Sequence, residues 1–113
     1  MAICQGIILC PLTFDHVFLV FSVQEFNRDL SIAVIQKFIK TYKEENAKRE
    51  TVRCLEALSA SGLRSVRYAK EIPDLTNIIA NDISEEAVQT IQNNIKLNQV
   101  EDKVTPSHSG KWN

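Results

Sequence analysis

Polar side chains able to do chemistry gather around one small-residue turn near the middle of the chain. Glu56 lies near the end of an apolar run, the tetrapeptide SASG (residues 59–62) follows it, and Asp82 ends a second apolar run. Small residues let the backbone turn sharply and leave room beside it for a ligand. Backbone N–H groups at a helix start also attract phosphates and carboxylates. We therefore expect an anionic group of a ligand to bind at the free backbone N–H groups from Gly62 to Ser65, in a crevice next to Ser61, Gly62 and Asp82.

The residues around this turn predict a strand, a helix and a second strand. An apolar run covers residues 52–58, apolar residues at helical spacing cover 63–69, and a buried type of strand covers 78–80. Pro73 helps to end the helix. A connection of this length joins parallel strands through a right-handed crossover, which predicts an α/β fold. The ligand crevice then lies outside the carboxyl ends of both strands.

Asp82 follows Gly62 by about 20 residues, the spacing at which an acid at the second strand's end binds ribose hydroxyls. A dinucleotide-binding turn has three glycines, whereas Gly62 is the only glycine in this turn. A pyrophosphate lying close to the turn is therefore disfavoured. A nucleoside cofactor with a small anionic group, such as S-adenosyl-L-methionine, fits the pattern better. The alternative is a structural strand-helix-strand unit in which Asp82 caps the next helix.

Three segments together resemble the tRNA (guanine-26 N2)-dimethyltransferase family. They are QEFNRDLS (residues 24–31), LEALSASGLRSVRYAKE (55–71) and IIANDIS (78–84). The similarity extends over about residues 23–107 and corresponds to the amino-terminal part of the family's methyltransferase domain. It implies a partial, truncated Rossmann-like class I S-adenosylmethionine-dependent methyltransferase fold, with parallel strands and flanking helices.

The resemblance also implies roles for single residues. Arg28 of the NRD triplet would pair with the methionine carboxylate, Glu56 would help to seat the methionine amino group, and Ile83 would lie against the adenine. Arg64, in the first turn of the helix after Gly62, can face the crevice. Glu56 could instead pair with Arg28 or Arg64, because a carboxylate on an apolar strand needs a partner. The alternative for Ile83 is core packing. The residues expected to bind the cofactor are Arg28, Glu56, Ser61, Gly62, Arg64, Asp82 and Ile83.

The activity implied by the resemblance is transfer of methyl groups from S-adenosyl-L-methionine to N2 of guanine 26 in tRNA. In the family, an acidic segment after a fourth strand does the catalytic work, and a separate carboxy-terminal domain binds tRNA. We expect neither in this chain, so no residue is assigned a catalytic role. The chain is expected to be a fragment or isoform, inactive alone. Two alternatives stay open: a nicotinamide-nucleotide-binding Rossmann half, and a non-catalytic truncated product.

Composition sets the limits of this interpretation. A length of 113 residues allows one domain, and a net charge of −1 gives no general electrostatic signature for RNA. Contacts with tRNA are therefore expected mainly through regions absent here. The three cysteines lack metal-ligand spacing, so no metal site is expected, and Cys54 fits a small buried hydrophobic residue.

Residues 1–22 differ from the rest of the chain. No Lys or Arg precedes Arg28, so no targeting signal is readable, and the apolar runs are too short to span a bilayer. We expect 1–22 to be a poorly ordered extension outside the family, with 17–21 as a possible added strand. Residues 23–113 are expected to form the amino-terminal half of a methyltransferase domain. The family resemblance implies a nuclear, cytoplasmic or mitochondrial location.

A long helix is expected before the central unit. Asn27 is a good helix cap, and Asp29 would then lie in the first turn, where an acid is favourable. Arg28 at such a start opposes the helix dipole and needs another reason to be there. An apolar stripe is expected to pack this helix on the core; its members are Leu30, Val34, Ile35, Phe38, Ile39 and Tyr42.

A helix and a strand are expected after Asp82. Ser84 would cap the helix and Asn98 would end it. Its sheet-facing residues are expected to be Ala87, Val88, Ile91, Ile95 and Leu97. A third strand is expected to start at residues 103–105. Arg67, one turn beyond Arg64, is expected at the surface, and His108 is expected to be solvated.

Overall fold

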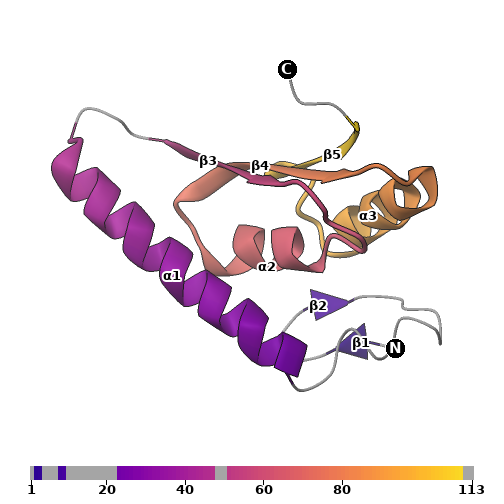
Figure 1. The fold of residues 1–113 in the computed structure, drawn as a ribbon, viewed down its shortest axis with the longest axis horizontal. Coiled ribbons are helices and arrows are strands. Elements are labelled where there is room, and N and C mark those ends of the chain that lie inside the picture. Colours follow the sequence, from indigo (N-terminus) through magenta and orange to yellow (C-terminus); the bar gives the residue numbers. More distant parts are fainter. Residues whose placement is uncertain (1, 4–7, 10–22, 48–50, 111–113) are drawn as a thin grey trace.

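The structure is a computed structural model that describes residues 2–3, 8–9, 23–47 and 51–110. It is an α/β fold in which three helices lie along one face of a parallel sheet (Figure 1). The elements in chain order are β1 (Ala2–Ile3), β2 (Ile8–Leu9), α1 (Val23–Glu45), β3 (Val52–Glu56), α2 (Leu63–Glu71), β4 (Leu75–Asp82), α3 (Glu85–Leu97) and β5 (Val104–His108).

The larger sheet has the order β3-β4-β5, and both strand pairs are parallel. Glu56 at the end of β3 is in register with Ala80, so β4 continues past it to Asp82. Asp82 is in register with His108 at the end of β5. The predicted strand-helix-strand unit is therefore confirmed, and all three strands end at one edge of the sheet.

One face of this sheet carries the core. Along β3 the side chains alternate between half-buried and exposed, as expected when helices cover one face alone. On β4, Ile78 and Ala80 are completely buried, while Ile79 between them is exposed. Val66 of α2 and Ile91 of α3 pack into the same core. Burying one such aliphatic side chain contributes about 1.5–3 kcal/mol, which is enough to fix the helices on this face.

The start of α1 differs from the prediction. The helix begins at Val23, so Asn27 lies inside it and is not the cap; its carbonyl accepts a hydrogen bond from the Ser31 hydroxyl at 2.8 Å. The acid in the first turn is Glu25 and not Asp29. Arg28 consequently lies beyond the first turn, and the argument from the helix dipole does not apply to it.

The prediction of a buried apolar stripe on α1 is only partly confirmed. Ile39 is buried and Ile35 partly buried, but Leu30, Val34 and Phe38 are more than half exposed. The face that α1 turns to the core is the adjacent one, which includes Ile32. Phe38 instead stacks on Tyr42, with ring centroids 5.8 Å apart.

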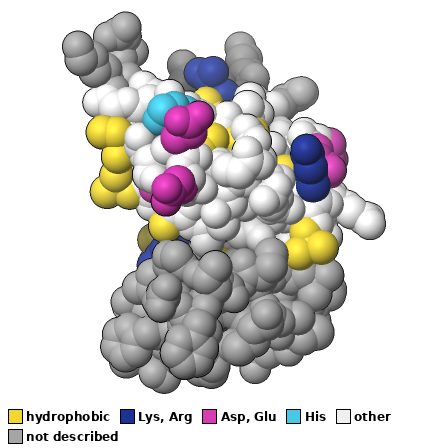
Figure 2. Space-filling view, turned by 90° about the vertical axis from the view of Figure 1, so that its right-hand side faces the viewer, with side chains coloured by type: hydrophobic (Ala, Val, Ile, Leu, Met, Phe, Trp, Pro, Cys, Tyr) yellow, Lys and Arg dark blue, Asp and Glu magenta, His cyan; other side chains and the backbone are white. Residues whose placement is uncertain are grey.

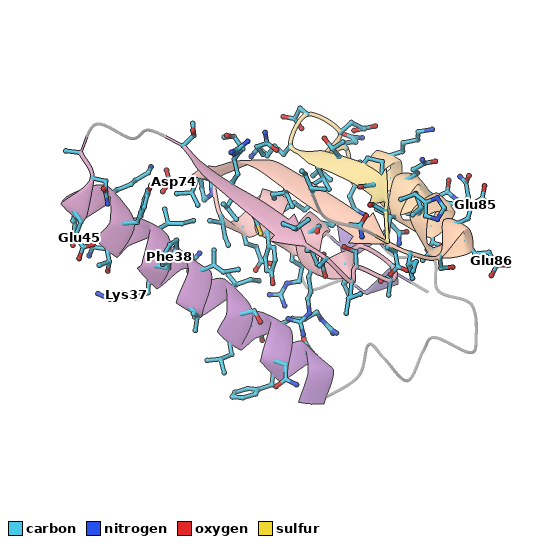
Figure 3. All side chains as sticks on the ribbon, turned by 45° about the horizontal axis from the view of Figure 1, so that its top comes forward. Lys37, Phe38, Glu45, Asp74, Glu85 and Glu86 are labelled. Atoms are coloured by element: carbon cyan, nitrogen blue, oxygen red, sulfur yellow. The ribbon has the colours of Figure 1, made fainter. Side chains whose placement is uncertain are left out.

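Polar contacts attach the second half of α1 to the end of α2 and to the segment after it. Lys43 near the end of α1 forms an ion pair with Asp74 at 2.5 Å. Figure 3 shows Asp74 next to α1, on the same side of the molecule as Glu45. About two turns earlier on α1, the side-chain amide of Gln36 donates to the Glu71 carbonyl at 3.1 Å. The long helix is therefore fixed at its carboxyl end as well as through its apolar face.

The predictions after Asp82 are mostly confirmed. The Ser84 hydroxyl accepts a hydrogen bond from the Ala87 amide at 3.3 Å, and α3 ends before Asn98. Val88, Ile91 and Ile95 are buried, as expected, whereas Leu97 is 44% exposed. The third strand is β5, which begins at Val104.

Most of residues 1–22, including the possible strand over 17–21, lies outside the described residues. The described pairs Ala2–Ile3 and Ile8–Leu9 form an antiparallel two-stranded sheet. Within the described ranges, none of the helices combines the length and apolar character needed to cross a membrane. Over the same residues, no three His, Cys, Asp or Glu side chains are grouped so that they could hold a metal ion.

Candidate functional site

The turn between β3 and α2 requires an unusual backbone. Gly62 precedes α2 with a φ of 75°, and its amide donates to the Ser59 carbonyl at 2.8 Å. A Cβ atom at Gly62 would lie 3.2 Å from Cγ2 of Ile91 on α3. Glycine is therefore needed twice, for the left-handed conformation and for the close approach of α3. Ala60 in the same turn also has a positive φ, 49°.

Asp82 connects this turn to the end of β4. Its Oδ2 atom accepts a hydrogen bond from the Ala60 amide at 3.0 Å, and its Oδ1 atom accepts one from the Ser84 amide at 2.9 Å. The structure thus brings Asp82 next to the small-residue turn, as predicted. The side chain does support the start of α3, but Ser84 itself is the cap. An ionised carboxylate has about four acceptor positions, so two remain for other donors.

Glu56 is the last residue of β3, and its carboxylate lies against the first turn of α2, where it accepts hydrogen bonds from Ser65. The Ser65 amide donates to Glu56 Oε2 at 3.1 Å, and the Ser65 hydroxyl donates to the same oxygen. Burial raises the pKa of Glu56, although the hydrogen bonds of Ser65 and Ser59 and the charge of Arg64 oppose this shift. The sequence suggested Arg28 or Arg64 as alternative partners of Glu56, and it did not indicate Ser65. The Ser65 amide was expected to be free for a ligand anion, and this was wrong, because Glu56 already accepts its hydrogen bond.

Three arginines lie where α1 meets α2. Arg28 is buried, with 6% of its surface exposed, and its pKa is lowered by that burial and by the charges of Arg67 and Arg64. The Arg64 guanidinium donates to the Ser31 hydroxyl at 2.8 Å. The site therefore has a positive region beside the first turn of α2, and the charge of Arg64 also reaches Glu56.

Arg67 was predicted at the surface, and this was wrong. Only 14% of its side chain is exposed, and it forms ion pairs with Asp29 and with Glu71, both at 2.6 Å. The pair with Asp29 connects α2 to α1. This contact depends on the docking of two helices, which the spacing of residues along one helix does not reveal.

Ser61 contributes to the site through its backbone. Its carbonyl accepts a hydrogen bond from the buried Asn94 side chain at 2.8 Å. The turn is thus attached to α3 on one side and to Asp82 on the other. This attachment fixes the backbone of the turn before any ligand binds.

The residues after β4 and β5 form the other side of the site. Ile83 is 68% exposed, so the alternative of core packing is wrong for this residue. A Cβ atom at Gly110 would lie 3.1 Å from Cδ1 of Ile83, which places the segment after β5 against this side chain. His108 is exposed, as expected, but its Nε2 lies 2.9 Å from the Ile83 carbonyl.

Figure 2 looks at the molecule from the side where Figure 3 shows Glu85 and Glu86 at the start of α3. Acidic and hydrophobic side chains lie together on this surface, beside a histidine (Figure 2). This surface therefore presents carboxylates and apolar groups side by side.

Parallel strands, a left-handed glycine before α2 and an acid at the end of β4 make this a partial Rossmann-like α/β fold. The model of the family "N2,N2-dimethylguanosine tRNA methyltransferase" matches residues 11–111. The chain belongs to this family, which confirms the resemblance found in the sequence and makes it a member of a family of enzymes.

Individual curated relatives of the chain point to the same family. A tRNA (guanine(26)-N(2))-dimethyltransferase of Caenorhabditis elegans is 42% identical over 109 residues, covering 78% of this chain and 20% of the relative. The protein of that name from Drosophila melanogaster is 40% identical, with 77% and 21% covered. An archaeal one, from Methanocaldococcus jannaschii, is 43% identical over 76 residues, with 66% and 19% covered. The chain thus spans about a fifth of the length of these relatives.

Proposed function

We propose that this chain binds S-adenosyl-L-methionine at the carboxyl edge of its sheet. It would serve as the cofactor-binding part of an enzyme that transfers methyl groups to N2 of guanine 26 in tRNA. The observation that carries the proposal is the contact between Asp82 and the Ala60 amide, 3.0 Å, which places a carboxylate beside the Gly62 turn. Membership of a methyltransferase family supports the use of a methyl donor.

The two arginines and Glu56 suit the amino-acid part of this ligand. Burial, and then the charges of Arg67 and Arg64, lower the pKa of Arg28, and a ligand carboxylate beside Arg28 and Arg64 would oppose both effects. Glu56 would interact with the ligand's ammonium group, which favours the ionised form that burial disfavours. Amino acid zwitterions carry both groups on one carbon, so a cationic and an anionic protein group are needed close together.

The remaining residues suit the nucleoside. The unused acceptor positions of Asp82 would bind the ribose hydroxyls, and the exposed Ile83 would lie against one face of the adenine. Ser61 and Gly62 would border the ligand through their backbone. All seven predicted residues thus have a place in one proposed binding mode.

The chemistry that the bound ligand supplies is a methyl group on a sulfonium, which is transferred by in-line displacement. The residues of this chain would bind the donor and fix its orientation, and orientation alone can contribute several kcal/mol to such a reaction, on the order of 7–11 at most. No residue of this chain is assigned the acceptance of the N2 protons. We therefore place tRNA contact and proton removal in other parts of the enzyme.

Residues 23–113 would form the amino-terminal half of the methyltransferase domain. The relative from Saccharomyces cerevisiae carries the name "tRNA (guanine(26)-N(2))-dimethyltransferase, mitochondrial". For this chain a nuclear, cytoplasmic or mitochondrial location is proposed from the family.

Calorimetric titration with S-adenosylhomocysteine, the product of methyl transfer, tests the proposal. The chain should bind this ligand and should bind NAD at least about tenfold more weakly, because the turn lacks two of the three glycines. Asp82→Ala should abolish measurable binding. Asp102→Ala, which removes an exposed acid just before β5, should leave binding unchanged and serves as the control.

Two outcomes would contradict the proposal. Preferential NAD binding would support the nicotinamide-nucleotide alternative. Absence of binding to either ligand by folded protein would support the non-catalytic alternative.

A further inference from the structure

Asn81 connects several segments at the site. It is buried, with 2% of its surface exposed, and its Nδ2 atom donates to the Ala57 carbonyl at 3.1 Å and to the Ser109 carbonyl at 3.0 Å. Its Oδ1 atom accepts from the Ser109 amide at 3.0 Å. Its backbone carbonyl accepts from the Ser59 amide at 2.8 Å.

These contacts join three segments that are distant in the sequence. Ala57 and Ser59 belong to the turn after β3, Asn81 lies on β4, and Ser109 follows β5. Ser109 presents both its amide and its carbonyl to Asn81, so one donor and one acceptor are required of the same side chain. A carboxamide meets this requirement, and its second N–H satisfies Ala57. The orientation of the amide group is therefore determined by its backbone partners.

The position of these segments decides what Asn81 does. The turn after β3 contains the Ala60 amide that Asp82 binds, so it lies on the ribose side of the proposed site. The segment after β5 continues to Gly110, which lies against Ile83 on the proposed adenine side. Asn81 itself is buried, with 2% of its surface exposed, so its contacts are with the protein's own backbone.

We infer that Asn81 is a positioning residue that sets the distance between the ribose side and the adenine side of the crevice. The inference rests on the proposed function and extends it to a residue with no assigned role. Asn81 holds the turn after β3 and the segment after β5 at a fixed separation, so the nucleoside enters a preformed site. Preorganisation of this kind raises affinity because less ordering is required on binding.

The isosteric substitution Asn81→Asp tests the inference. A carboxylate keeps the acceptor for the Ser109 amide, but it loses both donors and repels the Ala57 and Ser109 carbonyls. The two segments should move apart without loss of side-chain volume. Asn98→Asp is the matched control, since Asn98 is also a buried amide that donates to a backbone carbonyl, that of Asn94, at 2.8 Å. It lies at the other end of α3.

Two ligands separate positioning of the nucleoside from binding of the amino acid. S-adenosylhomocysteine carries both parts, and 5′-methylthioadenosine carries the nucleoside alone. Asn81→Asp should weaken the binding of both by about tenfold or more. Arg28→Met should weaken only the binding of S-adenosylhomocysteine. Asn98→Asp should leave both affinities within about twofold of the unchanged chain when all proteins are compared in their folded state.

Amide hydrogen exchange gives a readout at the segments themselves. In Asn81→Asp, the amides of Ser59 and Ser109 should exchange faster while those of the α3 core keep their protection. If Asn81→Asp does not fold, Asn81→Ser takes its place, since it retains one donor and leaves the segments less firmly held.

Equal affinity of Asn81→Asp and the unchanged chain for 5′-methylthioadenosine would overturn the inference while leaving the proposed function intact. An equal loss of ligand affinity in Asn98→Asp would also overturn the inference, because the weaker binding of Asn81→Asp would then follow from general destabilisation. Failure of the unchanged chain to bind either ligand would instead remove the proposed function, and the inference with it.

Discussion

The Asp82 carboxylate and the Ala60 amide, separated by 3.0 Å, join the end of β4 to the turn that follows β3. This contact forms across the parallel pair, between residues 22 positions apart in the chain. Ala60 has a left-handed backbone, with a φ of 49°, and donates from that conformation. The acid thus supports a backbone geometry that few residues other than glycine adopt easily.

Ala60 should therefore tolerate glycine but not a branched residue. Ala60→Val should lower the free energy of unfolding by about 1–2 kcal/mol, because a β-branched side chain at positive φ is strained. Ala60→Gly should change it by less than about 0.5 kcal/mol, since relief of strain and the greater freedom of the unfolded chain oppose each other. Urea denaturation of both variants measures the difference. Equal stability of the valine and glycine variants would show that the turn is not held in this conformation.

Gly62 should be more sensitive than Gly110, although a Cβ atom is crowded at both. Gly62→Ala combines a positive φ with an approach of 3.2 Å to the buried Ile91, and should lower the unfolding free energy by about 2–3 kcal/mol. Gly110→Ala meets only the end of the exposed Ile83 side chain, which can move away, so the change should stay below about 0.5 kcal/mol. Thermal or urea unfolding of the two variants provides the comparison. A larger loss for Gly110→Ala would contradict the described packing of α3 against the turn.

Glu56 should make stability depend on pH in a defined direction. Burial raises its pKa above the ordinary value of 4.5, so between that value and the raised pKa the folded chain binds more protons than the unfolded chain. The contribution of Glu56 to stability therefore falls as pH rises through this window. The difference in unfolding free energy between the unchanged chain and Glu56→Gln, measured in urea from pH 4 to pH 7, should shift in favour of Glu56→Gln. A shift in the opposite direction would mean that the hydrogen bonds of Ser65 outweigh burial.

Arg67 should contribute more to stability than Lys43, although both form ion pairs. The Arg67 side chain is 14% exposed and connects α2 to Asp29 of α1, whereas the Lys43 side chain is 37% exposed. Arg67→Met should lower the unfolding free energy by about 1–2 kcal/mol, because a largely covered guanidinium loses its pairs with two carboxylates, those of Asp29 and Glu71. Lys43→Met should change it by less than about 1 kcal/mol, as for other exposed pairs. Similar losses in the two variants would show that the Arg67 pair is not protected from solvent.

The central unit could be predicted because its information is local. Apolar runs, a small-residue turn and the spacing from Gly62 to Asp82 are sufficient to order β3, α2 and β4 and to bring Glu56 to the same edge. Parallel pairing then follows from the length of the connection. These parts of the site required no knowledge of distant contacts.

The parts that the sequence did not predict depend on tertiary packing. Two adjacent apolar stripes run along α1, and periodicity could not decide that Ile32 is buried while Phe38 is exposed. Arg67 is covered only because α1 docks beside α2. The role of Asn81 depends on three segments meeting behind the site, and a single Asn before Asp82 gives no indication of partners at Ala57 and Ser109.

An NMR titration of the chain with S-adenosylhomocysteine tests the central claim most directly, because it reports where the ligand binds. The account predicts the largest amide shifts at Gly62, Ser65 and Ile83, around the carboxyl edge of the sheet, with little change at Lys103 at the opposite edge. Shifts confined to other surfaces, or none at ligand concentrations in the millimolar range, would contradict the proposed cofactor site.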